Sequence, residues 1–211
     1  MKLFLSSEGV PRPDLLKGLL RSAAEPKVAL ISNAQDPYPS EIAKKRSAHV
    51  SELFALLGFV PTTLDLREYV GKVAALAEEL KKYHLIWCAG GNAFSLRYEM
   101  KASGFDTVIK DILATGIVYG GWSAGGVVAG PSLYPIEVMD DQRKAPAVVW
   151  EGLGLTEYFV WPHWDTDKYV PLQAEASERI KALPYEVVIL KDGQVLIDEN
   201  GHRQIVQQSP L

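Results

Sequence analysis

The sequence predicts an α/β domain built on a mostly parallel sheet with helices on both faces. Short apolar runs alternate with helical patterns through most of the chain, and this alternation is typical of strand–helix–strand units. Near the C-terminus the pattern changes to short strands separated by Asp-Gly and Asn-Gly, which are signals of tight turns. We therefore expect one domain over residues 1–211 whose sheet ends in a C-terminal antiparallel hairpin.

Local signals place each element. Ser40 is a good N-cap and Gly58 a good residue to follow a helix, so a helix is expected between them. The other expected helices are Asp14–Ala23, Val73–Tyr83 and two stretches after Asn92. The expected strands of the first part are Lys2–Ser6, Lys27–Ser32, Phe59–Leu66, His84–Cys88 and Gly116–Tyr119. Three antiparallel strands are expected to follow, at Glu186–Leu190, Gln194–Asp198 and Arg203–Val206, with turns at Asp192-Gly193 and Asn200-Gly201.

Composition narrows the class of protein. Hydrophobic residues make up 47% and charged residues 23% of the chain, which is ordinary for a globular domain with a core. The net charge of −4 shows no excess of basic residues, so nucleic acid is not an expected partner. Cys88 is the single cysteine, which fits a reducing compartment, and we expect it to be a buried strand residue. With no signal peptide pattern and no membrane-spanning run, the chain is expected to be cytoplasmic and not to bind membranes.

The segment around Ser123 carries the clearest chemical signal. It reads Gly121-Trp122-Ser123-Ala124-Gly125 and lies between an apolar strand and a helix of small residues, the context of a nucleophile elbow. The N–H of Ala124 then lies at a helix N-terminus, where it can donate to a developing oxyanion. The alternative is a Gly-rich turn whose serine only caps the helix, and the strand–elbow–helix context favours catalysis.

A serine nucleophile needs a base, and His163 is the best of the four histidines. It follows an apolar strand and Pro162, so it emerges where a strand ends and a loop begins. An imidazole there can accept the hydroxyl proton near neutral pH. The alternative is a loop histidine packed among Trp161 and Trp164. His49, His84 and His202 have positions that indicate structural or exposed roles.

Three blocks together resemble the peptidase E (aspartyl dipeptidase) and cyanophycinase family of serine peptidases, the S51-like peptidases. They are Gly90-Gly91-Asn92-Ala93-Phe94, Tyr119-Gly120-Gly121-Trp122-Ser123-Ala124-Gly125 and Pro162-His163, in an order and spacing that match from about Lys27 to Gly201. The resemblance implies a flavodoxin-like fold akin to class I glutamine amidotransferases, and a Ser-His-acid triad. It also implies an oxyanion hole from Gly91 and Ala124. From the chemistry alone, Gly90-Gly91 is equally compatible with a simple tight turn.

The third triad member departs from the family pattern. The resemblance puts Asp192 in place of the family's glutamate, after the strand Val187-Val188-Ile189. Asp192-Gly193 is equally a common hairpin turn signal. Asp165 and Glu186 are the alternative acids.

The expected substrate is a small peptide, hydrolysed without a cofactor or metal, in an oligomeric state that the sequence leaves open. The family's dipeptidases resemble one another in a Glu-Thr-Arg stretch that this chain lacks. Arg179 is more readily assigned to an exposed pair with Glu175, so a strict preference for N-terminal aspartate is not supported. His163 and Asp165 alone would give a metal only two ligands.

Two other classes of protein remain as alternatives. One is an α/β-hydrolase esterase, in which the acid precedes the histidine and would be Glu137, Asp140 or Asp141. The other is a non-catalytic binding domain that keeps the elbow.

Overall fold

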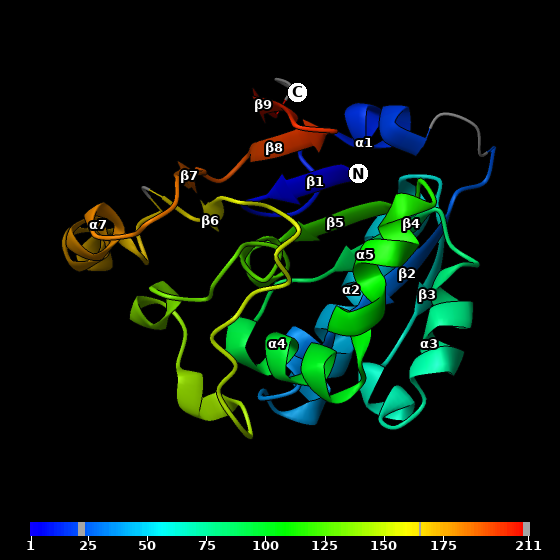
Figure 1. Ribbon diagram of the computed structural model, residues 1–211. Helices are drawn as coiled ribbons and strands as arrows, with labels where there is room; N and C mark the ends of the chain where they lie inside the picture. Colours follow the sequence, from blue (N-terminus) through cyan, green and yellow to red (C-terminus); the bar gives the residue numbers. More distant parts are fainter. Residues whose placement is uncertain (21–23, 165, 209–211) are drawn as a thin grey trace.

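The computed structural model describes residues 1–20, 24–164 and 166–208, and its α/β fold confirms the predicted class. The main sheet has seven strands in the order β3-β2-β4-β5-β1-β8-β9 (Figure 1). The first five strands in that order are parallel, and β8 and β9 add an antiparallel extension beyond β1. The expected C-terminal antiparallel hairpin is therefore β8–β9, which turns at Asn200-Gly201.

The strands are β1 Lys2–Ser6, β2 Lys27–Ile31, β3 Val60–Thr63, β4 Leu85–Cys88, β5 Val118–Trp122, β6 Phe159–Trp161, β7 Val187–Ile189, β8 Gln194–Glu199 and β9 His202–Gln207. The α-helices are α1 Pro13–Leu20, α2 Ser40–Leu56, α3 Val73–Leu80, α4 Ala93–Ala102, α5 Phe105–Ala114, α6 Ala124–Val127 and α7 Gln173–Lys181. Short 3-10 turns are η1 Asn33–Gln35, η2 Leu66–Tyr69, η3 Ile136–Val138, η4 Gln142–Lys144 and η5 Val170–Leu172.

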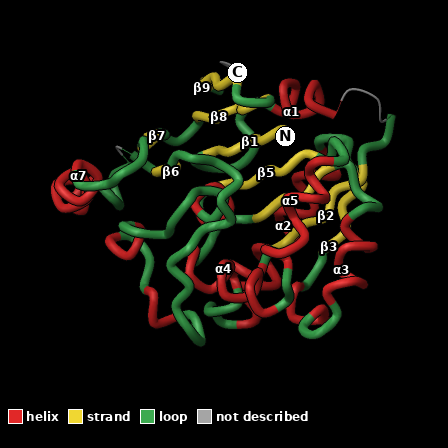
Figure 2. Tube along the Cα trace, viewed as in Figure 1, coloured by secondary structure: helices red, strands yellow, loops and turns green. Residues whose placement is uncertain are grey.

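The central strands β1, β2, β4 and β5 of the main sheet are buried on both faces, and successive side chains of each strand point to opposite sides. On one face, residues such as Ile86 and Cys88 of β4 pack with α3, α4 and α5. On the other face, Leu85 and Trp87 of the same strand pack with α1 and α2. All four side chains of β4 are fully buried. The strands thus form a layer between helices (Figure 2), as the alternating sequence pattern predicts.

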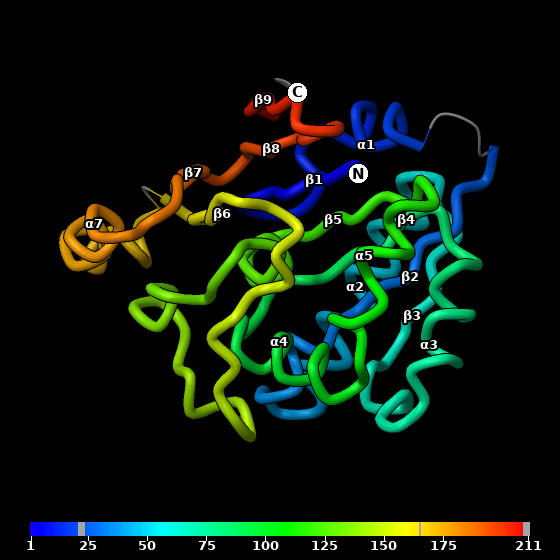
Figure 3. Tube along the Cα trace, in the orientation of Figure 1, coloured from blue at the N-terminus to red at the C-terminus, as the bar shows by residue number. Residues whose placement is uncertain are grey.

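One part of the expected topology is wrong. β7 does not form an antiparallel hairpin with β8 at Asp192-Gly193 but pairs with β6, in parallel, in a separate two-stranded sheet. Figure 3 shows β6 and β7 side by side beyond the ends of β1 and β8, although 25 residues separate them in the chain. The Asp-Gly signal was misleading because the chain does make a tight turn there, with the N–H of Gln194 donating to Lys191 C=O, but that turn connects two sheets.

Element ends differ from the expected ones by a few residues. Ser40 is the first residue of α2 and not its N-cap; Pro39 takes that position, and no side chain caps the helix there. Gly58 follows the end of α2 with φ +80°, as expected for a residue that must adopt a left-handed conformation. The last residues of the helix expected over Asp14–Ala23 lie outside the described residues. Among the described helices, we find none with the length and apolar character needed to cross a membrane.

Candidate active site

Ser123 lies in a strained turn between β5 and α6. Its φ of 49° and ψ of −116° are unusual for a residue with a side chain, and such strain is found mostly at functional sites. The turn lies close against β4, because a Cβ added at Gly125 would fall 2.0 Å from the carbonyl oxygen of Cys88. The Ser123 hydroxyl makes no capping hydrogen bond to α6, so the alternative of a simple helix cap is wrong.

Ser123, His163 and Asp192 form a continuous chain of hydrogen bonds. The Nε2 of His163 lies 3.0 Å from Ser123 Oγ, and its Nδ1 lies 2.7 Å from Asp192 Oδ1. The imidazole is 14% exposed, and it stacks on the ring of Tyr169 with centroids 5.3 Å apart. His163 is therefore held in place by Tyr169 and Asp192.

Two hydroxyl groups that the sequence analysis missed hold Asp192. Ser7 Oγ donates to Asp192 Oδ1 at 2.7 Å and accepts the backbone N–H of His163, also at 2.7 Å. Thr166 Oγ1 donates to Asp192 Oδ2 at 2.7 Å. Ser7 follows β1, the neighbour of β5 in the sheet, and this strand-end position is the one signal that could have identified it.

The surroundings of Asp192 favour its ionised form. Burial raises the pKa of this carboxyl, but hydrogen bonds from Thr166 and Ser7 and the charge of His163 outweigh burial, so the net pKa lies below the ordinary value. A carboxylate that accepts hydrogen bonds at both oxygens has a fixed orientation. It can therefore fix the orientation of the imidazole.

The other candidate acids do not contact His163 where the structure describes them. Glu186 lies before β7, at the far end of the small sheet, and accepts a hydrogen bond from Arg203 at 2.8 Å. Asp165 lies outside the described residues. The three acids of the esterase alternative have other partners: Glu137 pairs with Arg179, Asp140 accepts from the backbone of Ala93, and Asp141 pairs with Arg143.

The glycine loop after β4 faces the serine turn. Gly91 has φ +149°, and a Cβ there would fall 2.3 Å from the carbonyl oxygen of Ala34. Gln35 is buried and donates to the carbonyl of Gly90 through Nε2, and its Oε1 accepts from Arg46 at 2.9 Å. Within the described part of the chain, the amides of Gly91 and Ala124 have no hydrogen-bond acceptor. Both amides are thus available to a ligand.

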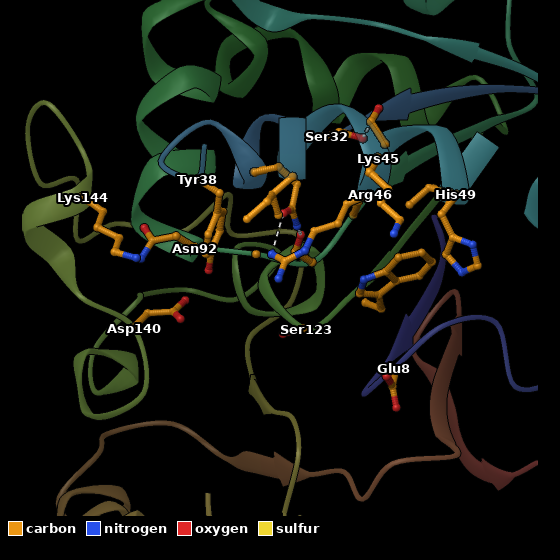
Figure 4. A pocket seen from close by; sticks show the side chains of 18 of the residues that line it. Glu8, Ser32, Tyr38, Lys45, Arg46, His49, Asn92, Ser123, Asp140 and Lys144 are labelled. Carbon is orange, nitrogen blue, oxygen red and sulfur yellow. Dashed lines mark hydrogen bonds between the residues drawn. The ribbon is translucent and has the colours of Figure 1, made fainter. Parts of the chain in front are cut away.

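An open cavity of about 1130 Å³ is lined by Ser123 and His163 and by Gln35, Gly90 and Gly91. Figure 4 shows Ser123 at its base, with Tyr38 and Arg46 opposite and Asp140 on one side. Cations on its wall are Lys45, Arg46, Lys144 and Lys168. Over the described residues, no group of three or more His, Cys, Asp or Glu side chains could hold a metal ion.

Two other sequence expectations concern residues outside this cavity. Arg179 forms the expected i,i+4 pair with Glu175 and a second ion pair with Glu137, so both of its terminal nitrogens are engaged. Cys88 is buried in β4, and burial raises the pKa of its thiol to about 12, which leaves it unreactive.

A serine, an imidazole and a carboxylate linked in this order are the arrangement that serine hydrolases use. Peptidase family S51 has a family model that matches residues 7–206. The chain belongs to this family of serine peptidases.

Individual relatives agree with this assignment. The uncharacterized peptidase Lmo0363 of Listeria monocytogenes serovar 1/2a is 30% identical over 149 residues, covering 66% of this chain and 71% of that protein. Peptidase E of Salmonella arizonae is 32% identical over 95 residues, covering 45% of this chain and 40% of that enzyme. The fold is similar to the crystal structure of a protein from Listeria monocytogenes EGD-e provisionally described as peptidase E. That similarity has a TM-score of 0.84 and 22% identity, and it covers 99% of this chain and 98% of the other.

Proposed function

We propose that this chain hydrolyses dipeptides or short peptides through an acyl-enzyme formed on Ser123. In this proposal His163 is the general base, Asp192 orients it, and the amides of Gly91 and Ala124 form the oxyanion hole. The observation that carries the proposal is the hydrogen-bonded chain from Ser123 Oγ through His163 to Asp192, at the base of an open cavity.

The geometry supports the following steps. His163 Nε2 takes the hydroxyl proton as Ser123 Oγ attacks the peptide carbonyl carbon, and Asp192 stabilises the imidazolium that forms. The amides of Gly91 and Ala124 donate to the oxyanion of the tetrahedral intermediate. The imidazolium then gives its proton to the leaving amine, which departs and leaves the acyl-enzyme. A water molecule repeats the sequence on the ester and releases the acid.

Substrate preference is proposed to be broader than for N-terminal aspartate. Arg179, the cation on the helix where the family's dipeptidases have their Glu-Thr-Arg stretch, already pairs with Glu175 and Glu137. We further propose that residues 1–211 act as one domain. We also propose a cytoplasmic location, because a chain with a single cysteine forms no internal disulfide, which fits a reducing compartment.

A fluorophosphonate label and a peptide panel test the proposal together. The label should attach to Ser123 in the wild type and not in Ser123→Ala, and the wild type should cleave some members of a panel of dipeptides, N-terminal acidic peptides and esters. Ser123→Ala should fold normally and lose nearly all turnover. A wild type that neither reacts with the label nor cleaves any panel member would instead be a binding domain, and a Ser123→Ala variant with full turnover would place the nucleophile elsewhere.

A further inference from the structure

Asp140 has a carboxylate that is only half engaged by the protein. Its Oδ2 accepts the N–H of Ala93, the first residue of α4, at 2.8 Å. The normal N-cap of that helix is already present, since Asn92 Oδ1 accepts from Ser95 N at 2.9 Å. Within the described part of the chain, the second oxygen of Asp140 has no hydrogen-bond donor. It borders the same cavity as Ser123, and Figure 4 shows the carboxylate directed into that cavity.

Asp140 is a partly buried anion in the same cavity as Ser123 and His163. Burial raises the pKa of its carboxyl to about 6, while the Ala93 amide and the charges of Lys168, His163 and Lys144 act in the opposite direction. At neutral pH the group is mostly ionised, and its free oxygen is a strong acceptor for a hydrogen bond from a cationic donor.

The neighbouring cations have partners of their own. Arg46 donates to Gln35 and lies over the ring of Tyr38, with its guanidinium carbon 4.7 Å from the ring centroid. Lys144 also lies over Tyr38, at 4.8 Å, and Lys168 donates to the hydroxyl of Tyr169 at 2.9 Å. None of these described cations forms a hydrogen bond with Asp140. A ligand could therefore supply the missing donor.

We propose that Asp140 binds the α-ammonium group of the substrate's N-terminal residue. The α-nitrogen of that residue lies two bonds from the carbonyl carbon that Ser123 would attack, so its site must lie in the cavity that holds the catalytic residues, which Asp140 also lines. The inference rests on the proposed peptidase function and deepens it. A carboxylate at this position selects peptides with a free amino terminus, so that the acyl group transferred to Ser123 is a single amino acid.

A purely structural role would give a different result. If Asp140 served only to cap α4, its replacement would lower stability and would affect free and blocked substrates equally. The discriminating quantity is therefore the ratio of reactivity toward a free amine and toward the same compound with its amine acetylated.

The first experiment measures covalent labelling of Ser123 by diphenyl 1-aminoethylphosphonate and by its N-acetyl form. The wild type should react faster with the free amine than with the N-acetyl form. Asp140→Asn should lower the rate with the free amine about 10–100-fold, the size expected for one hydrogen bond to a charged group. The rate of this variant with the N-acetyl form should stay within about threefold of the wild-type rate. Asp111→Asn is the matched control, because Asp111 is exposed on α5 and the same charge is removed. An equal change for both probes, or no change for either, would overturn the assignment.

The second experiment does not need a working nucleophile. Calorimetric titration of Ser123→Ala with alanyl-leucine and aspartyl-alanine should show binding that N-acetylation weakens, and Ser123→Ala/Asp140→Asn should lose this difference. If Ser123→Ala bound the free and acetylated dipeptides equally, the role of Asp140 would be wrong, even if fluorophosphonate labels Ser123 of the wild type. If the proposed peptidase function itself is wrong, the wild type will not react with fluorophosphonate.

Discussion

Asp192 Oδ1 lies 2.7 Å from His163 Nδ1, and the small parallel sheet brings these two residues together. His163 follows the end of β6 by two residues and Asp192 follows the end of β7 by three. The two strands run in the same direction in register, so the segments that follow them leave the sheet at the same edge. The pairing continues past the strands, because the N–H of Trp164 donates to Leu190 C=O at 3.0 Å.

Replacing Asp192 by asparagine should reduce turnover by orders of magnitude. Ser7, Thr166 and the Nδ1–H of His163 all donate to this carboxylate, so an amide NH₂ at either position would face a donor. The corresponding change in the chymotrypsin-type triad lowers kcat about 10⁴-fold, and we expect a loss of similar order. The free energy of unfolding should fall by about 1–3 kcal/mol. Steady-state kinetics and urea unfolding measure the two effects, and a kcat within threefold of the wild type would remove Asp192 from the mechanism.

The same carboxylate should make stability depend on pH in the acid range. The native pKa of Asp192 lies below its ordinary value of 3.8, so the folded protein binds the proton less readily than the unfolded chain. The stabilisation is therefore present above about pH 4 and is lost as the pH falls through the native pKa. Urea unfolding of wild type and Asp192→Asn should give free energies that converge as the pH falls from about 5 to 3. A constant difference over that range would contradict this prediction.

The sequence predicted the main sheet well because its signals are local. Each parallel strand is a short apolar run next to a helical pattern, and β4, with four fully buried residues, is the clearest case. The elbow at Ser123 was also predictable, because the strand, the glycines and the small-residue helix are contiguous.

The connection between Asp192 and His163 was harder to predict. Asp192-Gly193 carries a strong local turn signal, while the pairing of β6 with β7 is a contact between distant segments that no local pattern marks. Ser7 and Gln35 were missed for the same reason. Each is an ordinary polar residue after a strand, and its role depends on the backbone that comes to lie beside it.

Ser7→Ala should lower kcat about tenfold and leave KM nearly unchanged. The variant keeps the triad side chains but removes a donor to Asp192 and an acceptor for the backbone N–H of His163. Because a hydrogen bond of this kind contributes about 1–3 kcal/mol, a partial loss of orientation is expected. Ser6→Ala is the matched control, since Ser6 is equally buried and its hydroxyl donates to Gly9 C=O at 2.6 Å. Equal kcat values for the two variants would assign Ser7 a structural role only.

Gln35→Ala should weaken stabilisation of the oxyanion. The Gln35 side chain donates to the carbonyl of Gly90, which fixes the peptide group that carries the Gly91 N–H proposed to bind the oxyanion. Removing one oxyanion donor costs about 10²–10³ in kcat in a well-studied protease, and a displaced donor should cost less, about tenfold or more. Gln204→Ala, on the exposed strand β9, is the control. The rate of fluorophosphonate labelling should fall in parallel with kcat, and a change in KM alone would contradict the prediction.

The strain at Ser123 should be measurable as stability. Its φ of 49° and ψ of −116° cost a residue with a Cβ about 1–3 kcal/mol, and glycine avoids most of that cost. Both Ser123→Ala and Ser123→Gly lack the hydroxyl, so a comparison of the two isolates the backbone. Glycine also loses more conformational entropy on folding, by about 0.5–1 kcal/mol, so the net advantage should be about 1 kcal/mol. For a chain of 211 residues that corresponds to about 2–4 °C in Tm. Calorimetry should therefore show that Ser123→Gly melts above Ser123→Ala, and the reverse order would mean that the serine turn stores no strain.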